Sequence, residues 1–142
     1  MNDPQLKELY RSIKTIASVG VSSNEDKPSF GITLYLQERG YRIIPVNPTA
    51  KEIHGEQVYA DLLAIPEKVD VVQLFRRSED VPPFVDQAIQ IGAKVVWMQE
   101  GISNPEAAQK AEAAGLTVVM DRCMRAEHMR LFGARLFGLL RR

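Results

Sequence analysis

Short apolar runs alternate with amphipathic stretches along this chain. Runs rich in valine and isoleucine, bounded by glycine, proline or polar residues, predict strands at 15–21, 41–46, 69–75, 94–98 and 116–121. The spacing of apolar residues between these runs predicts helices at about 4–13, 29–39, 82–91, 105–114 and 125–140, and a short strand is expected around 57–59. The strands are apolar on both sides, which is typical of parallel strands covered by helices on both faces.

This order of elements predicts an α/β fold. Strands that alternate with helices of about three turns form βαβ units, so we expect a Rossmann-like three-layer sandwich with a mostly parallel sheet of five or six strands. No repeat, linker or shift in composition divides the chain, and one domain is expected over 1–142, with its core at about 9–131 and an amphipathic C-terminal helix at about 125–140. In such a sheet, ligands bind beyond the carboxyl ends of the strands.

Composition narrows the classes of function. Eighteen basic side chains balance eighteen acidic ones, so no overall field favours nucleic acid or an anionic membrane. The single cysteine excludes an internal disulfide, and two isolated histidines do not indicate a metal site. Neither a signal peptide nor a long apolar run is present, so the expected location is the cytoplasm.

The loop after the first strand is a candidate phosphate site. Glycine permits a tight turn there, and nearby backbone amides, serine hydroxyls and a lysine could face a pyrophosphate at the start of the next helix. The candidate residues are Gly20, Val21, Ser22, Ser23, Lys27 and Ser29. The next glycine is Gly31, so the glycine pattern of NAD-binding loops is missing. The alternative is a tight strand-to-helix turn with serine caps.

The second strand ends in Pro45-Val46-Asn47-Pro48, where NAD-binding folds carry an acidic residue for the ribose. A stiff apolar edge with one amide suits contact with an adenine face and a hydrogen bond to the base or ribose. The absence of a carboxylate leaves room for a 3′-phosphate, which Lys51 would help to neutralise. Alternatively, Asn-Pro forms only a turn.

The third strand ends in Phe75-Arg76-Arg77. One guanidinium could face phosphate, or the arginines could hold the loop through a salt bridge with Asp80 or Glu100, since arginines at strand ends are common on surfaces. Arg76 is the preferred ligand candidate of the pair.

Taken in order, five motifs resemble the small stand-alone coenzyme A-binding proteins, which are similar to the N-terminal domain of the succinyl-CoA synthetase α subunit. The motifs are Val19-Gly-Val-Ser22 with Asp26-Lys-Pro-Ser29, Gly40-Tyr-Arg-Ile-Ile-Pro-Val-Asn-Pro48, Val69-Asp-Val-Val-Gln-Leu-Phe-Arg-Arg77, Trp97-Met-Gln-Glu-Gly-Ile102 and Val118-Val-Met-Asp-Arg-Cys123. The resemblance covers about 9–131 and implies coenzyme A (CoA) or an acyl-CoA as the cofactor. At Lys27 relatives commonly carry arginine, so the positive charge is kept while the bidentate fork is lost.

The resemblance also implies roles near the pantetheine arm of CoA. Gln99, Glu100 and Gly101 would line its path, with Gly101 allowing close backbone approach. Glu100 is either a catalytic acid or a hydrogen-bond partner of its own loop. Cys123 could lie near the CoA thiol and form a mixed disulfide, or be a small buried hydrophobe.

The resemblance favours a non-catalytic binding module, because the synthetase needs a phosphorylated histidine and a nucleotide-grasping subunit outside this domain. No catalytic residue and no metal ligand is therefore predicted. The alternatives are a nicotinamide- or acyl-CoA-dependent enzyme that uses Glu100, Arg76 or Cys123, and a regulator that signals CoA supply to a protein partner. The C-terminal helix packs on the sheet, on a second copy of the chain in a homodimer, or on a membrane.

Overall fold

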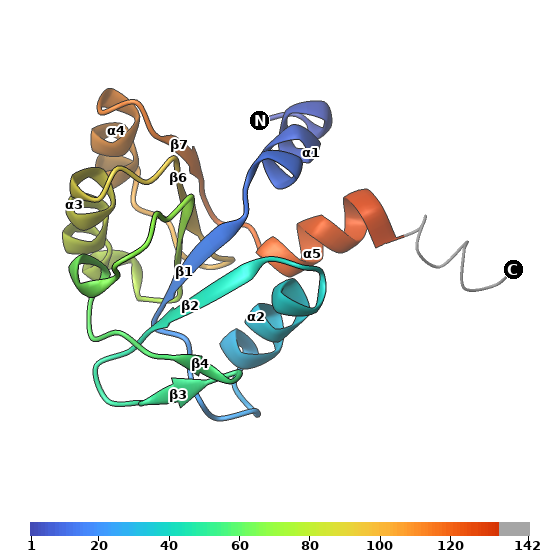
Figure 1. Ribbon diagram of the computed structural model, residues 1–142. Helices are drawn as coiled ribbons and strands as arrows, with labels where there is room; N and C mark the ends of the chain where they lie inside the picture. Colours follow the sequence, from blue (N-terminus) through green and yellow to red (C-terminus); the bar gives the residue numbers. More distant parts are fainter. Residues whose placement is uncertain (134–142) are drawn as a thin grey trace, which may run out of the picture.

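The structure is a computed structural model that describes residues 1–133, and it has three layers (Figure 1). The central sheet is all parallel, with the strand order β2-β1-β5-β6-β7. Its strands are β1 (Thr15–Val19), β2 (Arg42–Val46), β5 (Val71–Leu74), β6 (Val95–Met98) and β7 (Thr117–Val119). The predicted Rossmann-like α/β fold is confirmed, with five strands in this sheet.

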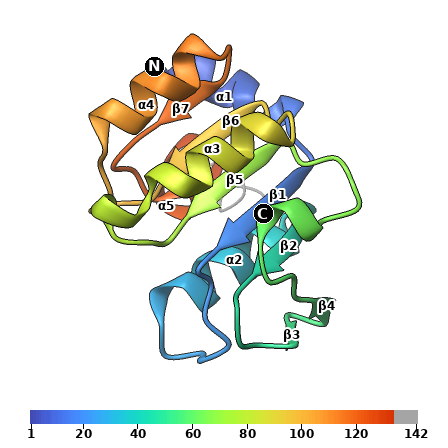
Figure 2. The same cartoon turned by 90° about the vertical axis from the view of Figure 1, so that its left-hand side faces the viewer.

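Helices cover both faces of the sheet, with α3 and α4 on one side and α1, α2 and α5 on the other (Figures 1 and 2). They are α1 (Asp3–Ser12), α2 (Pro28–Glu38), α3 (Pro82–Gln90), α4 (Pro105–Ala113) and α5 (Met124–His128), with 3-10 turns at Leu62–Ala64 and Ser78–Asp80. Four of them match the predicted helices to within one or two residues. The predicted last helix begins as α5 and continues as a π-helical turn, Met129–Gly133, and its remaining residues lie outside the described ones. Among residues 1–133, no helix has the length and apolar character to cross a membrane.

Two hydrophobic cores lie on the two faces of the sheet, because successive side chains of a strand point in opposite directions. Ala17 and Val72 face α3 and α4, whereas their neighbours Ile16 and Val71 face α1, α2 and α5. All four side chains are fully buried. This double burial explains why the strands show no alternation of polar and apolar residues.

A small hairpin differs from the prediction. The expected strand at 57–59 is replaced by two-residue antiparallel strands, β3 (Glu52–Ile53) and β4 (Glu56–Gln57). Between them His54 and Gly55 both have positive φ, as a tight type I′ turn requires. Tyr59 then forms a parallel bridge with Val46 at the edge of β2. Strands of two residues carry no recognisable periodicity, which is why the pattern did not separate them.

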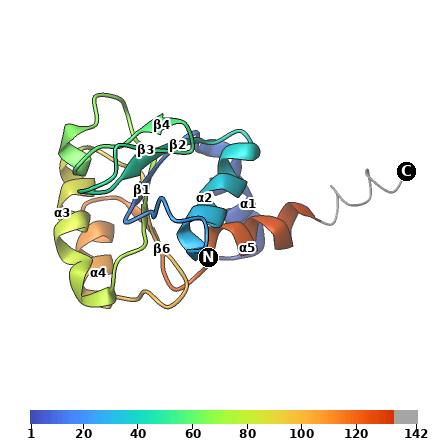
Figure 3. The ribbon, with the colours of Figure 1, turned by 90° about the horizontal axis from the view of Figure 1, so that it is seen from below.

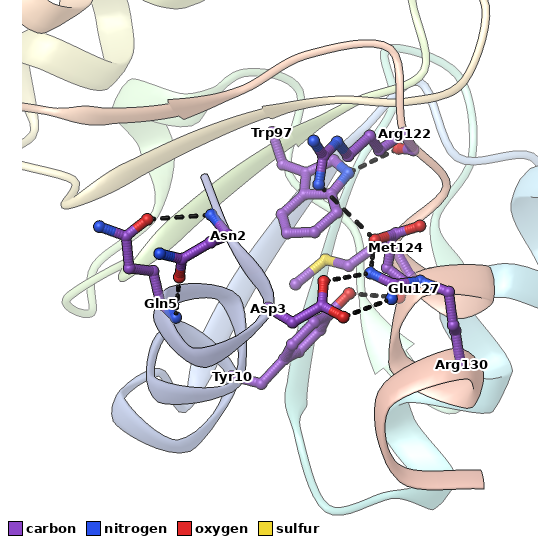
Figure 4. A network of polar contacts seen from close by, with 9 residues as sticks. All are labelled: Asn2, Asp3, Gln5, Tyr10, Trp97, Arg122, Met124, Glu127 and Arg130. Atoms are coloured by element: carbon purple, nitrogen blue, oxygen red, sulfur yellow. Dashed lines mark hydrogen bonds and ion pairs between the residues drawn. The ribbon is translucent and has the colours of Figure 1, made fainter. Parts of the chain in front are cut away.

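The segment around α5 is tied to α1 and β6 (Figure 4). The Tyr10 hydroxyl donates to the Met124 carbonyl oxygen at 2.6 Å, and the Trp97 indole N–H donates to the Arg122 carbonyl oxygen at 2.7 Å. On the surface, Arg130 lies 2.8 Å from Asp3. The segment around α5 is therefore held against α1 and against β6.

Asp70 ties together the beginnings of three strands. Its Oδ2 accepts the backbone N–H groups of Lys14 at 2.8 Å and Thr15 at 3.1 Å, and its Oδ1 lies 3.6 Å from the Lys94 ammonium. Burial alone would raise the pKa of this carboxyl group, but the two amides and Lys94 outweigh burial and lower the pKa below its ordinary value.

We expect Asp70→Asn to lower the free energy of unfolding by about 1–2 kcal/mol near neutral pH, since hydrogen bonds to a charged acceptor are lost. Because the pKa is lower in the folded state than in the unfolded state, this stabilisation is complete above the unfolded pKa and disappears as pH falls through the folded pKa. Urea denaturation of both proteins at about pH 7 and about pH 3 measures the difference. An equal difference at both pH values would contradict an ionic role for Asp70.

Candidate functional site

All five parallel strands end at the same edge of the sheet, which lies at the bottom of Figure 1 and faces the viewer in Figure 3. An open cavity of about 540 Å³ lies at this edge. Seven of the predicted site residues line it: Gly20, Ser22, Lys27, Ser29, Phe75, Gln99 and Glu100. Four other residues complete the lining: Pro28, Ile32, Ile102 and Cys123. The cavity therefore joins the loops after β1, β5 and β6 to the segment after β7 and the start of α2.

Gly20 is the first residue of the loop after β1. Its φ of +84° lies in the left-handed region, and its N–H donates to the Val46 carbonyl oxygen at 2.9 Å. A Cβ at this position would lie 3.1 Å from the Phe75 carbonyl oxygen and 3.2 Å from Nε of Arg76. Both the backbone conformation and the space therefore demand glycine.

The two serines of this loop contact each other. The Ser22 N–H donates to Oγ of Ser29 at 2.9 Å, and Oγ of Ser22 accepts the N–H of Asn24 at 3.0 Å. The Ser22 amide, predicted as a phosphate donor, is thus occupied within the protein. The two hydroxyl hydrogens have no acceptor among residues 1–133 and remain available at the cavity wall.

The N-terminus of α2 adds positive potential to the same wall. Lys27 is the N-cap residue and Pro28 occupies the first position of the helix. Lys27 is exposed and, within the described residues, has no ion-pair partner. Helix N-termini attract anions through their free amides and the helix dipole, so this wall suits a phosphate group.

Asn47 acts as a turn residue in the structure. Its Nδ2 donates to the Val21 carbonyl oxygen at 2.9 Å, and its Oδ1 accepts the N–H groups of Thr49 at 2.9 Å and Ala50 at 3.1 Å. Both the Nδ2 group and the Oδ1 atom of the side chain are therefore engaged within the protein. The geometry matches the alternative of an Asx-type turn that also fastens the first loop to the second.

The other predicted residues of the second loop lie outside the cavity lining. Pro45 and Val46 are buried, whereas Pro48 and Lys51 are exposed. Only Pro48 and Lys51 could therefore offer side-chain surface to a ligand that extends beyond the cavity. Ser23 is likewise exposed and outside the lining.

The arginines after β5 differ in their surroundings. Arg77 lies 3.1 Å from Asp80 and 3.4 Å from Glu79, which matches the alternative that it holds its own loop. Arg76 packs against Gly20, and its buried Nε has no hydrogen-bond partner among residues 1–133. Neither arginine lines the cavity, although Arg76 contacts the loop that does.

A buried row of polar side chains crosses the sheet toward the cavity. Oγ of Ser18 donates to Oε1 of Gln73 at 2.8 Å, and Nε2 of Gln73 donates to Oε1 of Gln99 at 3.1 Å. Oε1 of Gln99 also accepts the N–H of Met124 at 3.0 Å. Gln99 is only 4% exposed, and its Nε2 has no acceptor among residues 1–133. This Nε2 group is therefore available to an acceptor in the cavity.

Sequence reasoning overlooked Ser18 and Gln73. Each is a polar residue within an otherwise apolar strand, at positions where burial on both faces is expected. A buried polar side chain needs a hydrogen-bond partner. Two such residues in neighbouring strands would have been the available signal for a network beside the site.

The segments after β6 and β7 contact each other directly. The Gly101 N–H donates to Oδ1 of Asp121 at 2.7 Å, and Gly101 itself lies outside the cavity lining. Glu100 is exposed at the cavity, and its carboxylate accepts no hydrogen bond from residues 1–133. Cys123 is half-buried, packs partly against the core and lines the same cavity, so both alternatives for this residue stay open.

The cavity offers two kinds of surface. Lys27 and the start of α2 form a wall that suits an anion, whereas Ile32, Phe75 and Ile102 are apolar. Gln99 adds an amide donor to the same cavity. This arrangement suits a ligand that has both phosphate groups and a longer, largely uncharged arm.

Comparison with known proteins gives close matches over most of the chain. The uncharacterized protein YneT of Bacillus subtilis (strain 168) is 39% identical over 124 residues, which cover 87% of this chain and 92% of YneT. The structure of a hypothetical protein from Pyrococcus horikoshii OT3 is 42% identical, covers 94% of each chain and superposes with a TM-score of 0.91.

A larger enzyme contains a similar region. The ADP-forming acetate–CoA ligase II of Archaeoglobus fulgidus is 33% identical over 103 residues, which cover 70% of this chain but only 15% of the ligase. The sequence profile of the CoA binding domain matches residues 14–129, from the residue before β1 to the start of the π-helical turn. The chain therefore belongs to the CoA binding domain family.

Proposed function

We propose that this protein binds CoA or an acyl-CoA in the cavity at the carboxyl edge of the sheet, as a stand-alone module without catalytic activity of its own. One observation carries the proposal: a single cavity combines three features that suit CoA. They are the start of α2, which attracts anions, the apolar residues of the wall, and the side-chain amide of Gln99. CoA combines a pyrophosphate with a long pantetheine arm that contains amide groups. Membership of the CoA binding domain family supports the same ligand.

The parts of the ligand are assigned by chemistry. The pyrophosphate lies at Lys27 and the hydroxyls of Ser22 and Ser29, where positive potential is concentrated. The pantetheine arm follows Phe75 and Gln99, and Nε2 of Gln99 donates to one of its carbonyl oxygens. The adenosine end extends beyond the cavity lining.

The 3′-phosphate of the adenosine end is assigned to the exposed Lys51. If this is correct, dephospho-CoA, which lacks the 3′-phosphate, binds more weakly than CoA, and Lys51→Ala removes the difference. Equal affinities of the wild-type protein for CoA and dephospho-CoA would exclude this role.

The non-catalytic part of the proposal follows the expectation drawn from the resemblance. The similarity to the ligase covers only 15% of that enzyme, so it gives no ground for assigning the ligase activity to these residues. Incubation with acetyl-CoA checks this point. Release of free CoA at a rate above that of a protein-free control would favour the enzyme alternative instead.

Lys27→Ala is expected to weaken CoA binding about fivefold to tenfold, because one ion pair with phosphate is lost. Lys27→Arg should retain or improve affinity, since a guanidinium can donate two parallel hydrogen bonds to phosphate. Isothermal titration calorimetry with CoA, acetyl-CoA, NAD and NADP measures the affinities and separates CoA from nicotinamide cofactors.

Lys68→Ala is the matched control. Lys68 is also an exposed lysine, but it lies just before β5, at the opposite edge of the sheet from the cavity. The two alanine variants have the same net charge, so an equal loss of affinity would reveal only a general electrostatic effect. Tight binding of NAD in place of CoA would reject the proposed ligand.

A further inference from the structure

The cysteine at the cavity has surroundings that fix its position. Cys123 is the only cysteine in the sequence, it is half-buried, and it lines the same cavity as Lys27 and Gln99. It lies between β7 and α5, whereas Lys27 begins α2. The thiol and the anion-attracting wall therefore belong to different elements that face one cavity.

The backbone on both sides of Cys123 is held by buried groups. The preceding carbonyl oxygen, of Arg122, accepts the Trp97 indole N–H, and the following N–H, of Met124, donates to Gln99. The Met124 carbonyl oxygen accepts the Tyr10 hydroxyl, as Figure 4 shows. These bonds restrict the movement of the cysteine away from the cavity.

Gln99 gives an independent indication that a ligand arm passes this point. Its side chain is more than nine-tenths buried and lines the cavity, and its Oε1 is used twice within the protein. Its Nε2 is left without an acceptor among residues 1–133. Because Gln99 lines the cavity, an acceptor on a bound molecule could take a hydrogen bond from this N–H group. Because Oε1 of the same side chain holds the residue after Cys123, an arm bound by Gln99 runs close to the thiol.

We propose that Cys123 is a site of covalent attachment for CoA through a mixed disulfide. This inference rests on the proposed function, since the cavity first has to bind the CoA moiety. The co-reactant is a CoA disulfide. The Cys123 thiolate attacks one sulfur of that disulfide, the original S–S bond breaks, and a bond forms between Sγ of Cys123 and one CoA sulfur. The second CoA leaves as a thiolate and takes up the proton that Cys123 gave up.

The bound nucleotide makes the exchange selective. A disulfide carried by CoA is placed beside Cys123 by the contacts of Lys27 and Gln99, whereas glutathione disulfide has no pyrophosphate to bind at the Lys27 wall. The noncovalent site thus raises the local concentration of one disulfide near one thiol. The consequence is a binding module whose occupancy follows the redox state of CoA and is reset by reduction.

The test uses the full chain and oxidised CoA, with intact-mass spectrometry as the readout. We expect one CoA adduct per chain, complete reversal by dithiothreitol, and a rate that saturates as oxidised CoA increases. Acetyl-CoA has no free thiol, so it should slow labelling by occupying the cavity without reducing the disulfide. Oxidised glutathione at the same concentration should react about tenfold more slowly or less, since the advantage of prior binding is missing.

Two variants complete the test. Cys123→Ser should still bind acetyl-CoA in calorimetry but form no adduct, and Cys123→Ala gives a second null variant if the serine protein folds poorly. Labelling by oxidised glutathione as fast as by oxidised CoA, or labelling that acetyl-CoA does not slow, overturns the inference. Binding of acetyl-CoA without any adduct overturns it too, yet leaves the proposed function intact. Failure to bind acetyl-CoA at all rejects the proposed function itself.

Discussion

Replacing Trp97 with alanine is expected to lower the free energy of unfolding by about 3–5 kcal/mol, as for other large-to-small changes of buried aromatic residues. Trp97 lies in β6 with none of its surface exposed, and its ring contacts Tyr10 of α1 with centroids 5.7 Å apart. Its indole N–H also holds the Arg122 carbonyl oxygen beside Cys123 (Figure 4). A cavity at this position would loosen α1 and α5 together, and with them one wall of the ligand site.

Urea denaturation followed by far-UV circular dichroism measures this change, because Trp97 is the only tryptophan and its fluorescence is lost in the variant. Trp97→Phe is the matched control. It keeps an aromatic ring and loses the hydrogen bond to Arg122, so it should cost only about 1–2 kcal/mol. If the alanine variant were no less stable than the phenylalanine variant, the packing of α1 and α5 on β6 would be contradicted.

The fold could be predicted because its strands are buried on both faces. The run Val95-Val-Trp-Met has no polar face, which is typical of a parallel sheet covered on both sides. Local chemistry marks the start of α4, since the Asn104 side chain accepts the Ala107 N–H and caps the helix. The β3–β4 hairpin was missed because its contacts are too few to impose a pattern.

The candidate site could be predicted in outline because parallel strands place all of their carboxyl ends at one edge. That rule brought Lys27, Phe75 and Gln99, which are far apart in sequence, into one cavity. It could not separate residues that face the cavity from residues that hold the loops. Asn47 and Arg77 have the functional groups of ligand contacts, but their hydrogen bonds and ion pairs hold the loops instead.

The Ser18–Gln73–Gln99 row shows a further limit of sequence reasoning. Its hydrogen bonds depend on the register of strands that are distant in the chain, with Ser18 opposite Gln73 and Gln73 opposite Trp97. Register between β1, β5 and β6 is set by the packing of whole layers. No local pattern encodes it, although it brings Gln99, which lines the cavity, into hydrogen-bond reach of Gln73.

The second large effect is expected for Gly20→Ala. The left-handed backbone conformation at Gly20 costs an L-residue roughly 1–2 kcal/mol, and the added Cβ would lie 3.1 Å from the Phe75 carbonyl oxygen. That oxygen belongs to the backbone and cannot move aside without shifting the end of β5. The loop of Ser22 would therefore be displaced from α2, and CoA affinity should fall about tenfold or more in calorimetry.

Gly40→Ala is the control that separates backbone strain from a steric clash. Gly40 also has a left-handed φ, +98°, but a Cβ added there would have no atom within 4 Å. Gly40 follows α2 and lies outside the cavity lining, so this variant should lose only the backbone cost in stability and bind CoA with unchanged affinity. The difference between the two variants thus measures the steric demand at Gly20. Full CoA affinity in Gly20→Ala would mean that the first loop does not shape the binding site, and the pyrophosphate would then have to be held elsewhere.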